Sequence, residues 1–273
     1  MNSQKPIGVF DSGVGGLSVL REIHQLLPHE NLVYVADSEH APYGDKSQEF
    51  ILSRSTAIFE FFMRQSVKAI VVACNTATAA AVKELRTRYD LPLVALEPAI
   101  KPASEQTQTG VIGVLATSRT IQSNNFQILF NRFAHQVKII AQACPGLVDQ
   151  VEQGDLDSRK TRQLLWQYLA PLVEQQVDII VLGCTHYPFL APIIRELTGN
   201  HIKVIDSGPA IARRLAHLLE MQDLHAKTQH PGSVVFYSSA KAQKTHKVIS
   251  ALWGSPVSLE CMTEDSQLLT ARA

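Results

Sequence analysis

The hydrophobic pattern of this chain alternates between short apolar runs and longer amphipathic stretches. The runs predict strands, and the stretches between them have the spacing of helices. Continuous apolar strands separated by helices are typical of parallel sheets covered on both faces, so we predict an α/β fold. The expected strands are 7–10, 32–36, 69–73, 93–95, 111–115, 137–141, 178–182, 203–205, 233–237 and 257–259. The expected helices include 17–27, 47–65, 77–88, 120–133, 158–174, 210–219 and 241–252.

The ten expected strands favour two sheets of about five strands over one wide sheet. A cluster of prolines at 92, 98 and 102 indicates one boundary, and the DSGP segment at 206–209 indicates another. We therefore expect residues 1–96 plus 207–273 to form a first domain, with residues 97–206 inserted as a second. The expected fold is two pseudo-symmetric, doubly wound parallel-sheet domains with the active site in the cleft between them.

An internal echo links the two expected domains. The segment IVVACNT at 70–76 resembles IVLGCTH at 180–186, because each reads as strand, small residue, cysteine and two polar residues. The two cysteines, Cys74 and Cys184, are 110 residues apart, which is about the length of one α/β domain. This pattern indicates a pseudo-repeat with one copy in each domain.

Composition excludes several classes of protein. The formal net charge is zero, which does not fit the basic surface of a nucleic-acid-binding protein. No apolar run approaches the roughly 20 residues that cross a bilayer, so we expect no membrane span. The amino terminus carries no apolar segment followed by a small-residue cleavage site, so we expect no signal peptide and a cytoplasmic protein.

The four cysteines, at 74, 144, 184 and 261, form no CxxC pair and lack the spacing of a zinc ribbon. Disulfides are not expected in a reducing cytoplasm. Each cysteine is therefore either a small buried residue or a reactive thiol. Cys144 and Cys261 have no counterpart in the repeat, and we interpret them as structural.

Cys74 and Cys184 follow predicted strand ends and lie near the start of the next helix, where parallel α/β sheets bind ligands. Backbone N–H groups there lower the pKa of a thiol and bind anions such as a carboxylate. Alternatively, both are simply small residues that fit a tight corner. The polar residues that follow them directly, and can add hydrogen bonds, are Asn75, Thr76, Thr185 and His186.

Two thiols in equivalent positions narrow the reaction class. Redox chemistry needs the sulfur atoms within bonding distance, and a metal site needs a fourth ligand beyond Cys74, Cys184 and His186. Stereoinversion at carbon needs one group that removes a proton and another that donates one from the opposite face, and a thiol can do both. No pyridoxal signature is present, so we expect a reaction without cofactor or metal.

A glycine-rich loop, FDSGVGG at 10–16, follows the first strand. It lacks GxGxxG spacing, so it is a weak nucleotide signal. Asp11 can orient a thiol, accept its proton or pair with a substrate ammonium group, and Ser12 is a candidate polar contact. Helix capping is the alternative for both residues.

Three further segments can contribute to the same cleft. Tyr43 and the backbone of Gly44 lie in a turn after the second strand. The hydroxyl of Thr117 follows a strand end, where it can bind a carboxylate or cap a helix. Glu152 can hydrogen-bond His186 and fix its tautomer, or it can be a solvated surface residue.

The motifs FDSGVGGLSVL, PYGDKS, ACNTA, ATSRTI, LGCTHYP and IDSG occur in this order between residue 7 and about residue 214. Together they closely resemble the bacterial glutamate racemases of the aspartate/glutamate racemase superfamily. The resemblance implies that Cys74 and Cys184 are the two acid/base groups, that Asp11 and His186 support them, and that Glu152 assists His186. The implied substrate contacts are Asp11, Ser12, Tyr43, Gly44, Asn75, Thr76, Thr117, Thr185 and His186.

The resemblance also implies cofactor-independent conversion of L-glutamate to D-glutamate for peptidoglycan synthesis, by a homodimer. By analogy, Cys74 deprotonates the D enantiomer. The segment 146–150 (GLVDQ) departs from the bulky apolar, proline-containing pattern of the family. Some relatives carry an amino-terminal extension linked to activation by a cell-wall precursor, and we expect no such control here. The remaining alternatives are a racemase of aspartate or a hydantoin, an amino-acid-binding protein, and a redox or metal protein.

Overall fold

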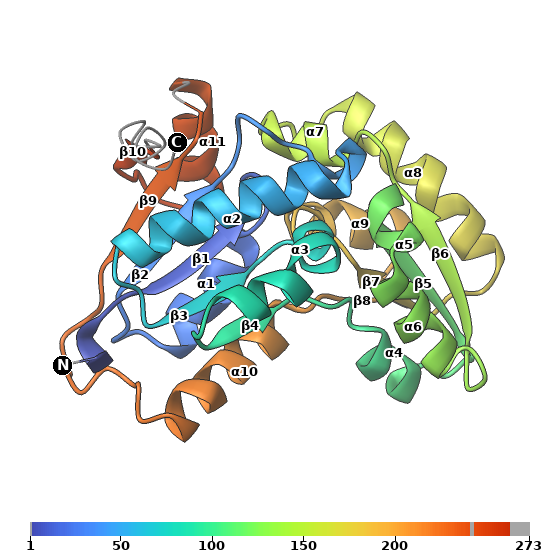
Figure 1. Cartoon of the computed structure of the whole chain (residues 1–273). Coiled ribbons are helices and arrows are strands. Elements are labelled where there is room, and N and C mark those ends of the chain that lie inside the picture. The colour runs from blue at the N-terminus through green and yellow to red at the C-terminus, as the bar shows by residue number, and fades with distance from the viewer. Residues whose placement is uncertain (1, 241–242, 263–273) are drawn as a thin grey trace.

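The computed structural model describes residues 2–240 and 243–262, and it contains two parallel β-sheets (Figure 1). The first has the strand order β10-β9-β2-β1-β3-β4, and the second has the order β6-β5-β7-β8. The strands are β1 (Ile7–Asp11), β2 (Leu32–Ala36), β3 (Ala69–Val72), β4 (Leu93–Ala95), β5 (Val111–Ala116), β6 (Lys138–Ala143), β7 (Ile179–Leu182), β8 (Lys203–Ile205), β9 (Val234–Ser238) and β10 (Leu259–Cys261).

Helices cover both faces of each sheet (Figure 1). The α-helices are α1 (Leu17–Leu26), α2 (Gln48–Arg64), α3 (Asn75–Arg88), α4 (Ile100–Gln106), α5 (Ser118–Gln122), α6 (Asn124–Phe133), α7 (Leu147–Glu152), α8 (Arg159–Glu174), α9 (Ala191–Thr198), α10 (Gly208–Met221) and α11 (Gln243–Trp253). Short 3-10 turns are η1 (Asn2–Gln4), η2 (Tyr43–Asp45) and η3 (Tyr187–Leu190). Within the described residues, no helix combines the length and apolarity that a membrane span requires.

The predicted α/β class and the two parallel-sheet domains are confirmed. The sheets have six and four strands where about five each were expected, and β9 and β10, from the segment expected to return to the first domain, join the first sheet. β9 pairs with β2 in register from Leu32–Val234 to Ala36–Ser238, and β10 pairs with β9. The domain limits at 96–97 and 206–207 stay a prediction, and residues 263–273 of the predicted first domain lie outside the described residues.

The two sheets share one topology. In the order β2-β1-β3-β4, the first strand of the domain lies between the second and third, and β6-β5-β7-β8 repeats this arrangement. Cys74 follows β3 and Cys184 follows β7, so the two cysteines occupy equivalent strand ends. The sequence echo therefore corresponds to a structural repeat.

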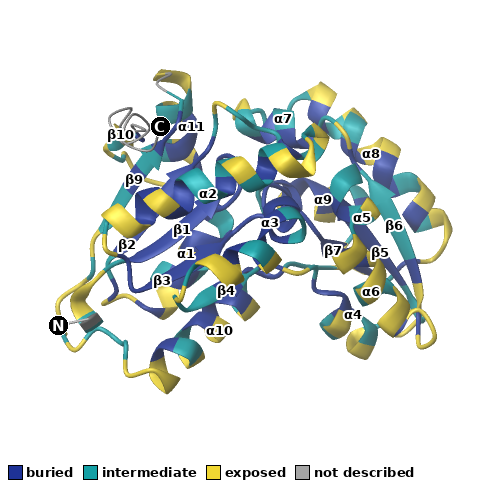
Figure 2. Ribbon diagram, in the orientation of Figure 1, coloured by how far each residue is buried: buried dark blue, intermediate teal, exposed yellow. Residues whose placement is uncertain are grey.

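Side chains alternate between the two faces of each strand, and the apolar ones form the hydrophobic core on each face. Val9 and Phe10 point to opposite faces of the first sheet, since side chains alternate along a strand. The cluster on the Val9 face includes α1 and α10 and continues into the second domain through residues such as Leu165 and Ile194. Figure 2 shows this continuous buried interior beneath exposed helix surfaces. The two domains are thus packed against each other as well as joined by the chain.

Several helices differ from the prediction. The expected helix at 120–133 is divided into α5 and α6 at Ser123, whose extended backbone lets its hydroxyl accept the Phe126 N–H at 3.2 Å. The helices α4 and α9, of seven and eight residues, were not among the expected helices. The first two residues of the expected helix at 241–252 lie outside the described residues.

The chain crosses between the domains at residues 96–99 and again at 206–207. A hydrogen bond joins the crossings, because the hydroxyl of Ser207 donates to the carbonyl oxygen of Glu97 at 2.5 Å. The two connections are therefore neighbours in space.

Candidate active site

Cys74 is the N-cap of α3, two residues beyond the end of β3. Its backbone is extended, and its sulfur accepts the N–H of Ala77 at 3.4 Å. The thiol lies 3.6 Å from the hydroxyl of Ser12 and is 4% exposed. The first cysteine is thus fixed by the helix that it begins.

Cys184 lies at the equivalent corner but is held differently. Its sulfur is 3.7 Å from Nδ1 of His186, and it is 7% exposed. A 3-10 turn, η3, follows it in place of an immediate α-helix. The carbonyl oxygen of Cys184 accepts the N–H of Tyr187 at 3.1 Å. The second cysteine therefore has a histidine partner that the first lacks.

Glu152 and His186 form a hydrogen bond of 2.7 Å between Oε1 and Nε2. The same carboxylate oxygen accepts the N–H of Val14, also at 2.7 Å, and so contacts the first domain. The unusual segment 146–150 does not displace Glu152, because it forms α7 after Gly146 adopts a positive φ of 83°. The side chain of Glu152 lies beside His186 and not on the open surface.

Asp11 lies behind the pocket at the end of β1 and is fully buried. Its Oδ2 accepts the N–H of Gly16 at 2.7 Å and the hydroxyl of Thr185 at 3.3 Å. It therefore caps the loop before α1, as the alternative interpretation expected, and also contacts the second domain.

The glycine-rich loop makes room for the Glu152–His186 pair. A Cβ atom on Gly13 would lie 1.8 Å from Oε1 of Glu152, and one on Gly15 would lie 2.3 Å from Nδ1 of His186. Real carbon atoms cannot approach so closely, so a larger residue at either position would force the side chain of Glu152 or His186 to move. The local role of these glycines is close packing between domains.

A single small pocket brings most of the predicted residues together. It is lined by Ser12, Pro42, Tyr43, Gly44, Cys74, Asn75, Thr76, Thr117, Val148, Gly183, Cys184, Thr185 and His186. Asp11 and Glu152 are absent from this lining and contact it from behind. The sequence analysis missed Pro42, Val148 and Gly183 as lining residues. Pro42 and Gly183 belong to recognised motifs, whereas nothing in the sequence marked Val148.

Hydroxyl groups connect the two walls of the pocket. Oγ1 of Thr76, on α3, lies 3.1 Å from Oγ1 of Thr117 and 3.3 Å from that of Thr120, both in the second domain. Thr117 also caps α5 by accepting the N–H of Thr120. Oδ1 of Asn75 is buried without a hydrogen-bond partner among the described residues, so an acceptor is left for a ligand.

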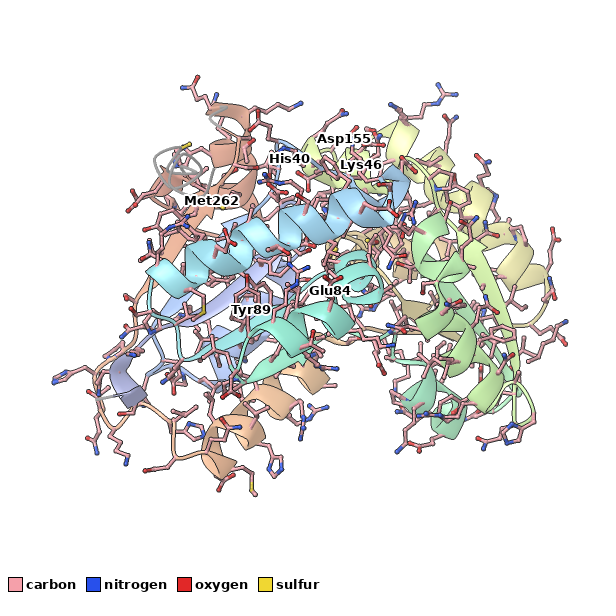
Figure 3. All side chains as sticks on the ribbon, viewed as in Figure 1. His40, Lys46, Glu84, Tyr89, Asp155 and Met262 are labelled. Atoms are coloured by element: carbon pink, nitrogen blue, oxygen red, sulfur yellow. The ribbon has the colours of Figure 1, made fainter. Side chains whose placement is uncertain are left out.

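A hydrogen bond to Asp37 holds the turn that carries Tyr43 and Gly44. The hydroxyl of Tyr43 donates to Asp37 at 2.5 Å, and Asp37 also accepts two hydrogen bonds from Arg54. Burial and the neighbouring carboxylate raise the pKa of Tyr43, so its hydroxyl stays protonated. Figure 3 shows His40 and Lys46, which precede and follow this turn in the sequence, near one end of α2.

The two thiols lie in opposite electrostatic surroundings. Burial lowers the pKa of His186, but hydrogen bonds to Cys184 and Glu152, with the charge of Asp11, outweigh it and hold this pKa well above 6.5. Burial and the charge of Asp11 raise the pKa of Cys74 well above its ordinary value. The expectation that a helix start lowers this pKa was therefore wrong for Cys74, because the Ala77 N–H offsets only part of the increase. Burial also raises the pKa of Asp11.

All four cysteines are free thiols. Cys144 is buried outside the pocket, where its thiol donates to the carbonyl oxygen of Gln142. Across residues 2–240 and 243–262, no group of three or more His, Cys, Asp or Glu side chains is placed to hold a metal ion. The expectation that no metal or cofactor takes part stays a prediction.

A closed pocket with one thiol on each wall, supplied by two repeated α/β domains, is the arrangement of an isomerase that inverts a carbon centre. Comparison with known proteins agrees with this class. The sequence profile of the Asp/Glu/hydantoin racemase family matches residues 7–215, and the chain belongs to this family.

Individual relatives resemble the chain over nearly its whole length. A glutamate racemase of Stutzerimonas stutzeri is 50% identical, over 93% of this chain and 96% of that protein. The crystal structure of a glutamate racemase isoform from Bacillus anthracis superposes with a TM-score of 0.86 at 33% identity, covering 96% of this chain and 98% of the other. The glutamate racemase of Francisella tularensis, solved with D-glutamate, gives a TM-score of 0.84 at 28% identity, with 97% and 99% coverage.

Replacing Glu152 with Gln removes one negative charge beside His186 but keeps an oxygen that can accept the Val14 N–H. We expect the pKa of His186 to fall in Glu152→Gln, as measured by NMR titration of the imidazole. Glu196→Gln removes a carboxylate that pairs with the distant Arg162, and it should leave the pKa of His186 unchanged. A His186 titration that is identical in wild type and Glu152→Gln would contradict the role of this pair.

The Glu152–His186 pair should make the free energy of unfolding depend on pH. A histidine whose folded pKa exceeds its unfolded value stabilises the fold fully below that unfolded value, about 6.5, and loses the effect as pH rises through the folded pKa. The difference in unfolding free energy between wild type and Glu152→Gln should therefore be largest near pH 6, which denaturant titrations at several pH values can measure.

Proposed function

We propose that this enzyme interconverts L- and D-glutamate without a cofactor, using Cys74 and Cys184 as its two acid/base groups. The observation that carries the proposal is that both thiols line one pocket from different domains. The substrate assignment is supported by a relative that is 50% identical and named glutamate racemase.

In the proposed reaction, one thiolate removes the α-proton from one face of the substrate. The resulting carbanion then takes a proton from the opposite thiol, which gives the other enantiomer. The roles of the two thiols exchange for the reverse reaction. A small pocket lined by buried residues favours this chemistry, because it aligns the reacting atoms and limits the access of competing proton donors.

The lining suggests how glutamate is held. Among the described lining residues there is no lysine or arginine, so His186 and neutral donors are the groups suited to bind the two carboxylates. Hydroxyls of Ser12, Thr76, Thr117 and Thr185 and backbone N–H groups, including that of Gly44, are suited to this role. The unpaired Oδ1 of Asn75 is suited to accept a hydrogen bond from the substrate ammonium group.

The supporting residues differ between the two walls. We assign Asp11 to the side of Cys74, where its carboxylate lies behind the pocket and its charge raises the pKa of that thiol. We assign His186 to Cys184, with Glu152 holding the imidazolium and its orientation. Catalytic acid and base groups commonly depend on such partners.

Deuterium incorporation tests the two-thiol mechanism. In D₂O, without added cofactor, wild type should invert each glutamate enantiomer and place deuterium at the α-carbon of the product, as followed by mass spectrometry and circular dichroism. Cys74→Ala and Cys184→Ala should each lower inversion by at least about 100-fold, the scale of a lost acid/base group. Cys144→Ala, which alters a thiol outside the pocket, is the control.

Two results would reject parts of this proposal. Inversion of aspartate but not glutamate would assign the enzyme to another branch of the family. Full inversion by either pocket variant would exclude the two-thiol mechanism.

We propose that Cys74 deprotonates the D enantiomer and Cys184 the L enantiomer. Elimination from a β-substituted glutamate analogue needs only one base, because removal of the α-proton expels the β-substituent. Cys74→Ser should lose elimination from the D-configured analogue by roughly 100-fold and keep it from the L-configured one. The opposite selectivity would reverse the assignment.

We further propose a homodimer that works in the cytoplasm and supplies D-glutamate for peptidoglycan synthesis. The resemblance to glutamate racemases supports the dimer and the pathway, and the need for free thiols favours a reducing compartment. Sedimentation velocity should give about twice the chain mass of 30.1 kDa, and cell fractionation should place the enzyme with cytosolic markers. A monomer or a secreted enzyme would contradict these assignments.

A further inference from the structure

Ser18 makes a hydrogen bond between the domains close to one thiol. It is the second residue of α1, and its hydroxyl oxygen lies 2.9 Å from the carbonyl oxygen of Thr185 in the second domain. It also lies 2.9 Å from the carbonyl oxygen of Gly15 in its own loop. One hydroxyl thus joins the loop of the first domain to the chain that carries Cys184.

The Thr185 carbonyl belongs to the peptide group that leads directly into His186. Because a peptide group is planar and rigid, holding its oxygen also holds the nitrogen and Cα of His186, from which the side chain extends. That side chain faces the sulfur of Cys184 at 3.7 Å. Ser18 therefore acts on the Cys184–His186 contact through the backbone, without touching the thiol.

The Cys74 corner needs no such anchor. α3 begins there and continues for 14 residues, and its first turn holds the cysteine through the N–H of Ala77 and Thr78. The Cys184 corner is followed by a 3-10 turn of four residues, which supplies less local support. Removing Ser18 should consequently affect one wall of the pocket and not the other.

We infer that Ser18 is a positioning residue for the acid/base group Cys184, and that it holds the Thr185–His186 peptide from the opposite domain. The inference rests on the proposed two-thiol function. A residue of the first domain, Ser18, thereby helps to hold the acid/base group of the second domain in place.

Racemisation rates alone cannot test this inference. The equilibrium constant between enantiomers is one, so kcat/KM must be equal in both directions for every variant. One-base elimination separates the two walls, because each configuration of a β-chloroglutamate loses its α-proton to one thiol. The products, 2-oxoglutarate, ammonia and chloride, can be assayed by a coupled dehydrogenase.

Ser18→Ala should lower kcat/KM for elimination from the L-configured analogue by about threefold to tenfold, the scale of one lost hydrogen bond. Elimination from the D-configured analogue should change by less than about twofold. Ser18→Thr, which keeps the hydroxyl, should restore most of the loss. Ser104→Ala is the matched control, since Ser104 donates to a carbonyl three residues earlier, as Ser18 does, but makes no contact between domains.

Alkylation provides a second readout that does not depend on turnover. In Ser18→Ala, the rate of Cys184 modification by iodoacetamide, measured by mass spectrometry, should change relative to that of Cys74, because the Cys184–His186 contact is altered. An equal change at both thiols, or an equal loss of elimination from both enantiomers, would overturn the inference and indicate a general structural role.

Failure of the proposed function gives a different result. If Cys184→Ala retains elimination from the L-configured analogue, the two-thiol assignment is wrong. If Cys184→Ala abolishes that elimination while Ser18→Ala leaves both elimination and alkylation unchanged, only the role of Ser18 is wrong.

Discussion

The close approach of the 12–16 loop to the second domain is the contact on which the pocket depends. Glycine at positions 13 and 15 lets the loop lie against Glu152 and His186, and the N–H of Val14 hydrogen-bonds the Glu152 carboxylate. This contact closes one side of the pocket without any bulky side chain. It also brings Glu152 and Asp11 near an imidazole ring that already hydrogen-bonds Cys184, and together these groups hold the pKa of His186 well above 6.5.

The two walls of the pocket differ, although the proposed reaction runs in both directions. The repeated topology gives each domain a cysteine at the same strand end, but Cys74 has a carboxylate nearby and Cys184 has a histidine. Burial alone disfavours a thiolate at either position. The groups beside each cysteine therefore differ, a carboxylate at Cys74 and an imidazole at Cys184, while the backbone geometry repeats.

The sequence predicted the features that depend on local pattern. Buried strands such as β3 and β7 consist of uninterrupted apolar residues, and the echo around Cys74 and Cys184 located both pocket walls. The short helices α4 and α9 were not predicted, because helices of this length are stabilised mainly by packing against the rest of the fold. The return of the carboxyl-terminal segment to the first domain was expected, but its pairing partner β2 was not, nor was the hydrogen bond from Ser18 to Thr185, because both join distant segments. The raised pKa of Cys74 depends on burial and on the charge of Asp11, so it could be judged only from the structure.

The paired crossings between the domains restrict how the enzyme can open. Two neighbouring chain segments, joined by the hydrogen bond from Ser207 to Glu97, favour rotation of one domain against the other about the line through them. A rotation that admitted the substrate would have to break contacts between the domains, such as that of Val14 with Glu152. The same rotation would also move Cys74 and Cys184 apart, so that both thiols would reach the substrate only when the domains close.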